Sequence, residues 1–245
     1  MPVFFIADLQ LTDGVLTITG PLLDHLQKSL RVTVGEKLWV SDNRRKRYFI
    51  HVTTVTRMEM RGHVLEERVA PQPCHPTVVL AQAILKGDRM DWVIQKATEL
   101  GVTSIVPIIS ERVIARPRLE RLIPQQQRWQ RIAFEAAQQA ERWDVPEVSP
   151  PAELLTCLRS PVGQLKLILS ERSDEGNLMT MTLPQDAEGR ILLVIGPEGG
   201  WSASEREAAQ ASGCTSVSLG PRILRAETAA LAALTIIQGR IGELG

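Results

Sequence analysis

A proline-rich break near residue 72 separates two kinds of sequence and predicts a chain of two domains. The segment 70–77, APQPCHPT, holds three prolines in eight residues, which rules out a helix interior and is typical of an interdomain linker. Before the break, turn residues separate short runs rich in β-branched residues at 15–20, 37–42, 47–57 and 62–69, with one helix expected at 21–31. This pattern favours a small all-β barrel or sandwich.

After the break, apolar runs alternate with amphipathic segments. Strands are expected at 77–85, 102–109, 165–170, 190–196 and 215–219, and helices at 88–100, 120–141, 151–158, 203–212 and 226–240. Asp88 is a candidate N-cap for the first helix, and Gly101 is expected to end it. Nearly continuous apolar strands indicate a sheet covered on both faces. The sequence therefore predicts domains at 1–71 and 76–245, the second an α/β domain with a mainly parallel sheet.

Charge and cysteine content narrow the classes of function only slightly. The 245 residues carry 28 basic and 28 acidic side chains, so net charge indicates no partner. The three cysteines, Cys74, Cys157 and Cys214, fit neither a disulfide framework nor a CxxC metal site, which favours a reducing compartment. The four histidines have no ligand-like spacing, so no metal is expected. With no signal peptide and no long apolar run, we expect a cytoplasmic protein without a membrane span.

The segment 195–205, IGPEGGWSASE, places a glycine-rich turn directly after an apolar strand. It lacks the glycine spacing of the dinucleotide fingerprint and the Lys-Ser/Thr of the P-loop. Glu198 would repel a polyphosphate, so a neutral or cationic ligand is easier to accommodate. A capping box of Ser202 with Glu205, or of Ser204 with Glu207, would start the next helix. Alone, the segment also fits a strand, a turn and a capped helix that bind nothing.

A second strand-ending turn lies in the segment 219–237, LGPRILRAETAALAALTII. Two such turns predict one ligand site at the carboxyl ends of the sheet. Glu227 falls in the first turn of the following helix, where a carboxylate favours the helix dipole. The alternative for Arg225 and Glu227 is a local ion pair of little energetic value. The helix itself is apolar nearly all round, so it must be buried on several sides, one of which a partner subunit could supply.

Five segments together carry a family resemblance: 25–36 (HLQKSLRVTVGE), 82–102 (QAILKGDRMDWVIQKATELGV), 107–112 (PIISER), 195–205 and 219–234. Over essentially its whole length the chain resembles the ribosomal RNA small subunit methyltransferase E family of the SPOUT superfamily. The resemblance implies an α/β SPOUT domain with a C-terminal deep trefoil knot, a topology that general rules would not suggest. It also implies a preceding PUA-like β-barrel that engages RNA, and a homodimer.

By this resemblance the cofactor is S-adenosyl-L-methionine and the reaction is methylation of N3 of one uridine in 16S ribosomal RNA. The sulfonium cation of the cofactor removes the objection raised by Glu198. Arg225 is the candidate to stabilise the developing uridine anion, and Glu227 the candidate proton acceptor, although Glu227 could equally cap its own helix. The expected cofactor-binding residues are Leu169, Ser170, Gly196, Glu198, Gly200, Leu219, Gly220, Arg222, Ile223, Leu224 and Thr228.

The segment 43–50, NRRKRYFI, is the candidate RNA contact, because it sets four basic residues beside two aromatics. The alternative is a solvated hairpin tip with two core aromatics. The expected RNA-binding residues are Arg31, Arg44, Arg45, Lys46, Arg47, Arg112 and Arg142, with Lys86 and Arg89 as possible extensions of the same track. Glu141 stands where the family often has glycine, and Asp144 where another basic residue is common, which weakens the case for phosphate binding at that turn.

Three other functions compete with this interpretation. Another SPOUT specificity, such as tRNA ribose or guanine methylation, would use the same two turns. A non-catalytic RNA-binding assembly factor would bind RNA without the cofactor, and the intact GPEGG and LRAET segments argue against it. A nucleotide-phosphate enzyme is least favoured, because neither phosphate-binding motif is present.

Overall fold

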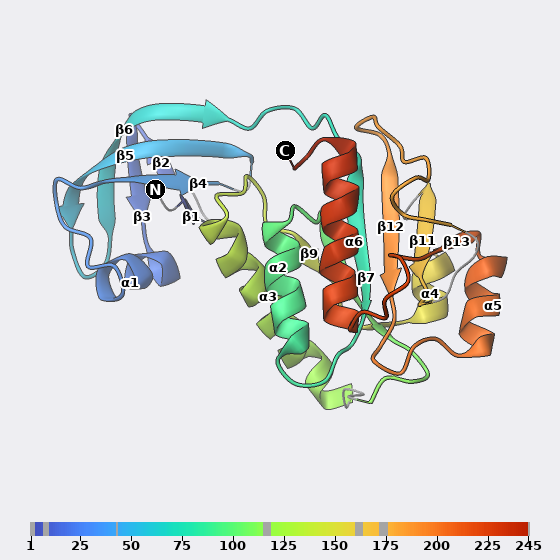
Figure 1. The fold of residues 1–245 in the computed structure, drawn as a ribbon. Helices are drawn as coiled ribbons and strands as arrows, with labels where there is room; N and C mark the ends of the chain where they lie inside the picture. The colour runs from blue at the N-terminus through green and yellow to red at the C-terminus, as the bar shows by residue number, and fades with distance from the viewer. Residues whose placement is uncertain are drawn as a thin grey trace. The chain divides into compact units, whose positions relative to one another are not determined.

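The computed structural model describes residues 3–6, 10–42, 44–114, 119–159, 164–171 and 176–244 (Figure 1). The chain divides into two units, Met1–Gln72 with Ala137–Asp144, and Pro73–Ala136 with Val145–Gly245. The first unit thus takes in a short stretch from the middle of the chain. Within the described ranges, no helix has both the length and the apolar character needed to cross a bilayer.

The first unit is a six-stranded sheet with one helix. Its elements are β1 (Val3–Phe5), β2 (Gln10–Thr12), β3 (Val15–Ile18), α1 (Gly20–Lys28), β4 (Lys37–Ser41), β5 (Lys46–Val55) and β6 (Met60–Val69). The strand order is β1-β4-β5-β6-β3-β2; β1 runs parallel to β4, and the other pairs are antiparallel. Alternate side chains such as Leu16 and Ile18 are fully buried and form one core with Leu23 and Leu26 of α1.

The second unit is an α/β structure. Its elements are β7 (Thr77–Ala83), α2 (Arg89–Glu99), β8 (Ser104–Ile109), the 3₁₀ turn Leu119–Arg121, α3 (Leu122–Gln139), β9 (Glu147–Val148), β10 (Ala152–Glu153), α4 (Leu154–Arg159), β11 (Leu165–Leu169), β12 (Arg190–Ile195), α5 (Ala203–Ala211), β13 (Cys214–Val217) and α6 (Ala226–Ile241). The strand order is β10-β8-β7-β12-β11-β13, with β9 also on β8, and every pairing is parallel.

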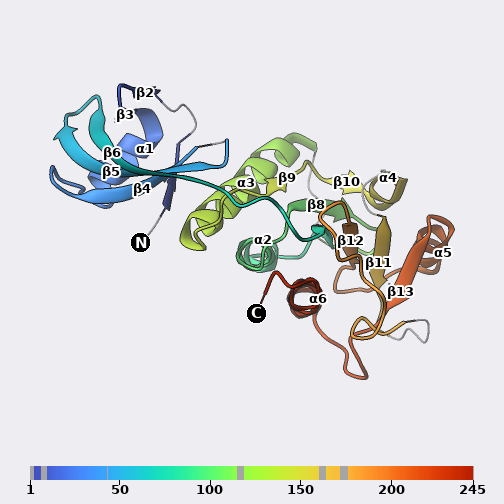
Figure 2. The same ribbon diagram turned by 90° about the horizontal axis from the view of Figure 1, so that it is seen from above.

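Helices cover both faces of this sheet. Helices α2 and α6 lie side by side on one face, and α4 and α5 lie on the other (Figure 2). This covering explains why β7 and β12 are buried along nearly their whole length. Helix α2 ends at Glu99, and Gly101 follows its C-cap Leu100 with a φ of +87°, which would strain any other residue. At this end Gln238 of α6 donates to the carbonyl oxygen of Leu100 at 2.9 Å and so fixes the two helices together.

The structure confirms the mainly parallel α/β sheet and places the five expected strands of that sheet within about two residues of their predicted bounds. It adds the very short strands β1, β2, β9 and β10, which the sequence pattern did not reveal. Between the two possible capping boxes it selects Ser202 with Glu205. Asp88 occupies the N-cap position of α2, but its side chain makes no capping hydrogen bond.

Candidate active site

A pocket of about 900 Å³ lies at the carboxyl ends of the parallel strands of the second unit. The turns after β11, β12 and β13 form most of its wall, and Arg89 and Arg112 reach it from the segments that follow β7 and β8. Its lining residues are Arg89, Arg112, 169–171, 195–201, Arg206, Leu219, Gly220, 222–226 and Ala229. This is the edge at which open α/β sheets bind ligands.

The turn after β12 is packed too tightly for larger side chains. A Cβ atom on Gly196 would lie 3.0 Å from Cε2 of Trp201. The Trp201 indole is fixed in turn, because its Nε1 donates to the carbonyl oxygen of Leu169 at 2.9 Å. Gly200 has a φ of +66°, a conformation that favours glycine. The glycines therefore let the backbone form the wall of the pocket itself.

Glu198 connects this turn to the segment after β7. Its Oε1 accepts hydrogen bonds from Nη1 of Arg89 at 3.0 Å and from the backbone amide of Lys86 at 3.3 Å. The carboxylate is therefore not turned back onto the amides of its own turn. A single acidic side chain holds two strand-end segments that are distant in the sequence.

Glu205 performs the corresponding role toward the segment after β8. Its Oε2 accepts from the amide of Ser202, which completes the capping box, and its Oε1 accepts from the amide of Glu111, each at 2.9 Å. The next residue, Arg112, donates to the carbonyl oxygen of Gly199 at 3.0 Å. The buried Glu205 carboxylate thus positions an arginine on the rim of the pocket.

The turn after β13 supplies charged groups that remain available to a ligand. Neither Arg222 nor Arg225 has a side-chain partner among the described residues, and both line the pocket. Glu227 lies in the first turn of α6, with its Oε1 3.9 Å from Nε of Arg89. Its Oε2 is buried and accepts no hydrogen bond from any described residue. An unpaired buried carboxylate oxygen is costly, so this is the polar atom of the turn that most needs a donor.

Most of the expected cofactor-binding residues come together around this pocket, and so does Arg225. Glu227 and Thr228 are not among its lining residues; Glu227 is largely buried next to Arg89, and Thr228 is exposed. Arg112, expected to bind RNA, is one of the residues that line the pocket. Sequence reasoning missed Trp201, Glu171, Arg206 and Ala229 of the lining. The signal for Arg89 was present, because the Gly87 turn that precedes it also joins a strand to a helix.

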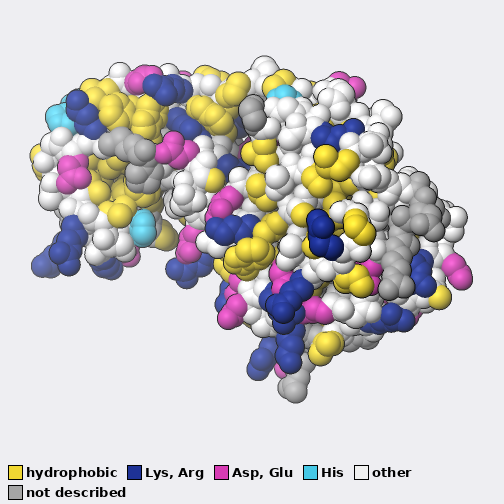
Figure 3. Space-filling view, viewed as in Figure 1, with side chains coloured by type: hydrophobic (Ala, Val, Ile, Leu, Met, Phe, Trp, Pro, Cys, Tyr) yellow, Lys and Arg dark blue, Asp and Glu magenta, His cyan; other side chains and the backbone are white. Residues whose placement is uncertain are grey.

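The basic run of the first unit is largely occupied by contacts within that unit. Arg45 donates to the carbonyl oxygen of Pro71 at 3.1 Å, and Lys46 pairs with Glu67 at 2.6 Å, which raises the pKa of Lys46. Arg44 is exposed, and its side chain has no partner among the described residues. The visible surface intersperses both signs of charge and shows no large field of one sign (Figure 3).

Arg47 is 9% exposed and lies behind the stretch Ala137–Asp144. Its guanidinium stacks over the Trp143 ring at 3.8 Å and donates to the carbonyl oxygen of Glu141 at 2.6 Å. Burial lowers the pKa of Arg47. Glu141 has a φ of +52°, which explains physically why glycine suits this position.

The two other candidate RNA contacts also lie outside the pocket. Arg142 pairs with Asp144 at 3.1 Å, and Arg31 is exposed with a φ of +53°.

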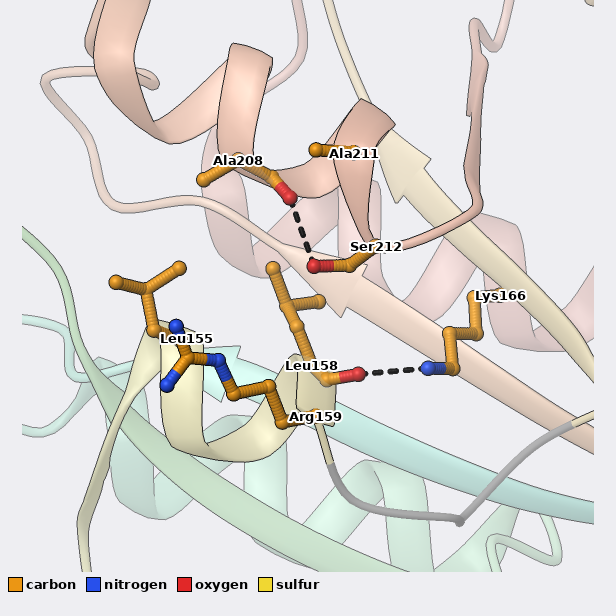
Figure 4. A pocket seen from close by; sticks show the side chains of 7 residues that line it. All are labelled: Leu155, Leu158, Arg159, Lys166, Ala208, Ala211 and Ser212. Carbon is orange, nitrogen blue, oxygen red and sulfur yellow. Dashed lines mark hydrogen bonds between the residues drawn. The ribbon is translucent and has the colours of Figure 1, made fainter.

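A second hollow, of about 520 Å³, lies between α4 and α5 (Figure 4). Lys166 belongs to the amino-terminal part of β11, so this hollow is at the opposite edge of the sheet from the pocket. Its Nζ donates to the carbonyl oxygen of Leu158 at 2.6 Å, and Ser212 Oγ donates to that of Ala208 at 2.8 Å. These polar atoms are engaged in closing helix ends, so the strand-end pocket is the better candidate for chemistry.

The side chains available for metal or thiol chemistry are few. In the part of the chain that the structure describes, no three His, Cys, Asp or Glu residues gather in a way that could hold a metal ion. All three cysteines are free thiols. Burial raises the pKa of Cys157 to about 11 and also raises that of Cys214. Neither thiol lines the strand-end pocket, which leaves its carboxylates and arginines as the reactive groups.

Comparison with known proteins bears on this pocket directly. Residues 72–238 match the model of an RNA methyltransferase domain. The ribosomal RNA small subunit methyltransferase E of Synechocystis is 33% identical over 236 residues, covering 95% of this chain and 75% of that protein. The same enzyme of Neisseria gonorrhoeae, solved with bound S-adenosyl methionine, is 34% identical with a TM-score of 0.86, covering 98% of each chain. A Legionella pneumophila protein solved with SAM is 30% identical with a TM-score of 0.87, covering 97% of each chain.

Proposed function

The chain belongs to the ribosomal RNA small subunit methyltransferase E family, and we propose that it methylates N3 of a uridine in 16S ribosomal RNA with S-adenosyl-L-methionine as donor. The observation that carries the proposal is the strand-end pocket, which Arg225 lines with a guanidinium that has no partner among the described residues. Glu227, two residues farther along, lies next to this lining, 3.9 Å from Arg89, and its buried Oε2 has no partner in the described part of the chain. One group suits an N–H donor, and the other suits a developing anion.

The pocket offers backbone groups and a carboxylate to the cofactor. The turns at 196–200 and 219–224 bring backbone amides and carbonyls to its wall, where the adenine edge would be read. The lining carries five arginines and two glutamates, so its net charge is positive and suits anionic RNA, while Glu198 is a carboxylate that the cationic cofactor would meet. When bound, S-adenosyl-L-methionine supplies a methyl group on a positively charged sulfur. Leu169, Gly196 and Leu224 would hold it, with Trp201 closing the wall behind Gly196.

The residues of the chain then have distinct tasks. Uridine N3 carries a proton and becomes nucleophilic as that proton leaves. The Glu227 carboxylate would accept the proton and become a carboxylic acid, and the N3 lone pair would take the methyl group as the bond from that group to the donor sulfur breaks, leaving a neutral thioether. Arg225 stabilises the negative charge that develops on the uracil ring. Arg222, on the rim, would bind the RNA backbone next to the target nucleotide.

The finer features of the fold are part of the proposal. A C-terminal knot is supported by Arg240 of α6, which donates to the carbonyl oxygens of Leu178 and Met181 in the segment between β11 and β12 at 2.7 and 2.6 Å. A homodimer is supported by α6, whose apolar residues Leu231 and Ile236 are only partly buried in the single chain. The first unit would be the PUA-like module that engages RNA. Light scattering tests the dimer.

The test combines binding with mapping of the product. Calorimetry with S-adenosyl-L-methionine is followed by methyl transfer to small subunits that lack the modification, with the product mapped at nucleotide resolution. We expect binding, and one 3-methyluridine. Methylation of another base or of a ribose would replace the proposed specificity with another SPOUT activity. RNA binding without cofactor binding would leave the assembly-factor interpretation.

The proposed role of Arg225 has its own variant. Arg225→Ala should keep cofactor affinity and lose transfer by about 10²-fold or more, the typical cost of removing a group that stabilises developing charge. If the variant transfers methyl groups normally, Arg225 is a structural residue.

A further inference from the structure

Arg89 lies between two carboxylates, that of Glu198, which lines the pocket, and that of Glu227, which lies next to it. Arg89 is the first residue of α2, after the Gly87 turn that ends β7, and its side chain is 44% exposed. Nη1 donates to Glu198 Oε1 at 3.0 Å, and Nε lies 3.9 Å from Glu227 Oε1. The guanidinium thereby joins the segments after β7 and β12 to the first turn of α6.

The two carboxylate oxygens of Glu227 differ in their surroundings. Its side chain is only 12% exposed, and the oxygen near Arg89 is Oε1, whereas Oε2 is buried without a partner among described residues. Nε of Arg89 lies within ion-pair distance of Oε1 but beyond hydrogen-bond distance, so the contact orients the carboxylate by charge, and burial of the side chain limits how it can turn. A planar guanidinium suits this task, because its several N–H groups can meet two acceptors at once.

An isolated, exposed ion pair contributes little to stability, but the ion pair between Arg89 and Glu198 is not isolated. The Glu198 carboxylate is 21% exposed and is also held by the amide of Lys86, so it provides a fixed anchor. Arg89 is therefore restrained on one side and faces the proposed proton acceptor on the other.

We infer that Arg89 is a positioning residue: anchored by Glu198, it fixes the orientation of the Glu227 carboxylate beside the pocket, where Glu227 would serve as the proton acceptor. The inference rests on the proposed function for the identity of the substrate, but the placement of Glu227 by Arg89 is independent of it. Arg89 itself forms no covalent bond with the substrate and transfers no proton. Its removal should slow the chemical step and leave the cofactor pocket standing.

The kinetic test compares Arg89→Ala, Arg89→Lys and a matched control, Arg128→Ala, which removes an arginine that pairs with Asp91 of α2 outside the pocket. We expect kcat to fall about 10²-fold in Arg89→Ala, the lower end of what general acid–base catalysis contributes. KM for RNA and cofactor Kd by calorimetry should change less than about threefold, and Arg89→Lys should recover part of kcat. Arg128→Ala should behave as wild type.

A double variant separates positioning from folding. Adding Arg89→Ala to Glu227→Gln should lower kcat almost no further, because the carboxylate that Arg89 holds is already gone. The inference would be overturned if the kcat losses of the two single variants multiplied in full in the double variant. It would also be overturned if Arg89→Ala changed only thermal stability and cofactor affinity.

A structural readout completes the test without activity. In a crystal structure of Arg89→Ala we expect the Glu227 side chain to leave its buried orientation. If it stays in place, the positioning role is refuted whatever the enzyme methylates. If wild type instead transfers to another atom while Glu227 moves as expected, the proposed specificity fails and the positioning role stands.

Discussion

Replacing Glu205 by glutamine tests whether one buried carboxylate organises two walls of the pocket. Glu205 is 6% exposed, and its two oxygens accept from the amides of Ser202 and Glu111, each at 2.9 Å. Glutamine keeps the shape and one acceptor oxygen, but it directs an NH₂ group at an amide that is itself a donor. One buried amide is then left without an acceptor, and the helix loses its N-terminal negative charge.

The cost follows from these contacts. A hydrogen bond to a charged group contributes about 1.5–3 kcal/mol, and an anion at a helix N-terminus about 0.3–1 kcal/mol. We therefore expect Glu205→Gln to lower the free energy of unfolding of the second unit by about 2–4 kcal/mol. Cofactor affinity should also fall, because the segment that carries Arg112 loses one of its contacts with the start of α5, the hydrogen bond from the Glu111 amide.

The assay is urea unfolding, with hydrogen exchange of the Glu111 amide as a local probe and calorimetry for cofactor binding. The matched control is Glu207→Gln, an exposed position on the same helix with the same charge change, which should alter stability by no more than about 0.5 kcal/mol. If both variants unfold alike and exchange at Glu111 is unchanged, the carboxylate does not join the two segments.

Three further predictions concern other parts of the molecule. Gly196→Ala places a Cβ 3.0 Å from the adjacent indole ring, so cofactor Kd should rise about tenfold by calorimetry; an unchanged Kd would show that the ring can yield. Arg47→Ala should destabilise the first unit by about 2 kcal/mol in thermal unfolding, whereas Arg44→Ala should only reduce the salt dependence of RNA binding. The reverse outcome would place the RNA contact at Arg47. At pH 8 only Cys74 should react quickly with a thiol reagent, and rapid labelling of two native thiols would contradict this. Because the pKa of Cys157 is raised to about 11, the buried thiol contributes stability below pH 9 that is lost as the pH rises toward 11.

The sheet and the location of the pocket could be predicted because both depend on short-range patterns. The apolar run 191–195 indicates a buried strand without reference to its neighbours, and the rule for parallel sheets then puts its closing turn at a ligand site. The capping box of Ser202 and Glu205 is local as well, although only the structure distinguishes it from the alternative two residues later.

The partners of the charged residues depend on the packing of distant segments. Glu198 could be assigned to a cofactor, a substrate or its own turn, and the structure pairs it with Arg89, 109 positions earlier. Arg47 looked like a surface residue within a basic run, but it stacks on Trp143, which lies far along the chain. Composition and spacing contain no signal for such pairs. The two-residue strands β9 and β10 were missed because they are too short for any period to show.

The first unit is assembled from two separate stretches of the chain, and this limits how the protein can be dissected. A fragment that stops at the proline-rich linker would omit Trp143 and expose the guanidinium that this ring covers. A fragment made to study the unit alone therefore has to include Ala137–Asp144, for example by joining that stretch to the first 72 residues through a short linker. For the same reason, a module of this kind cannot be exchanged between enzymes by one crossover at the linker, and its two stretches have to be inherited together.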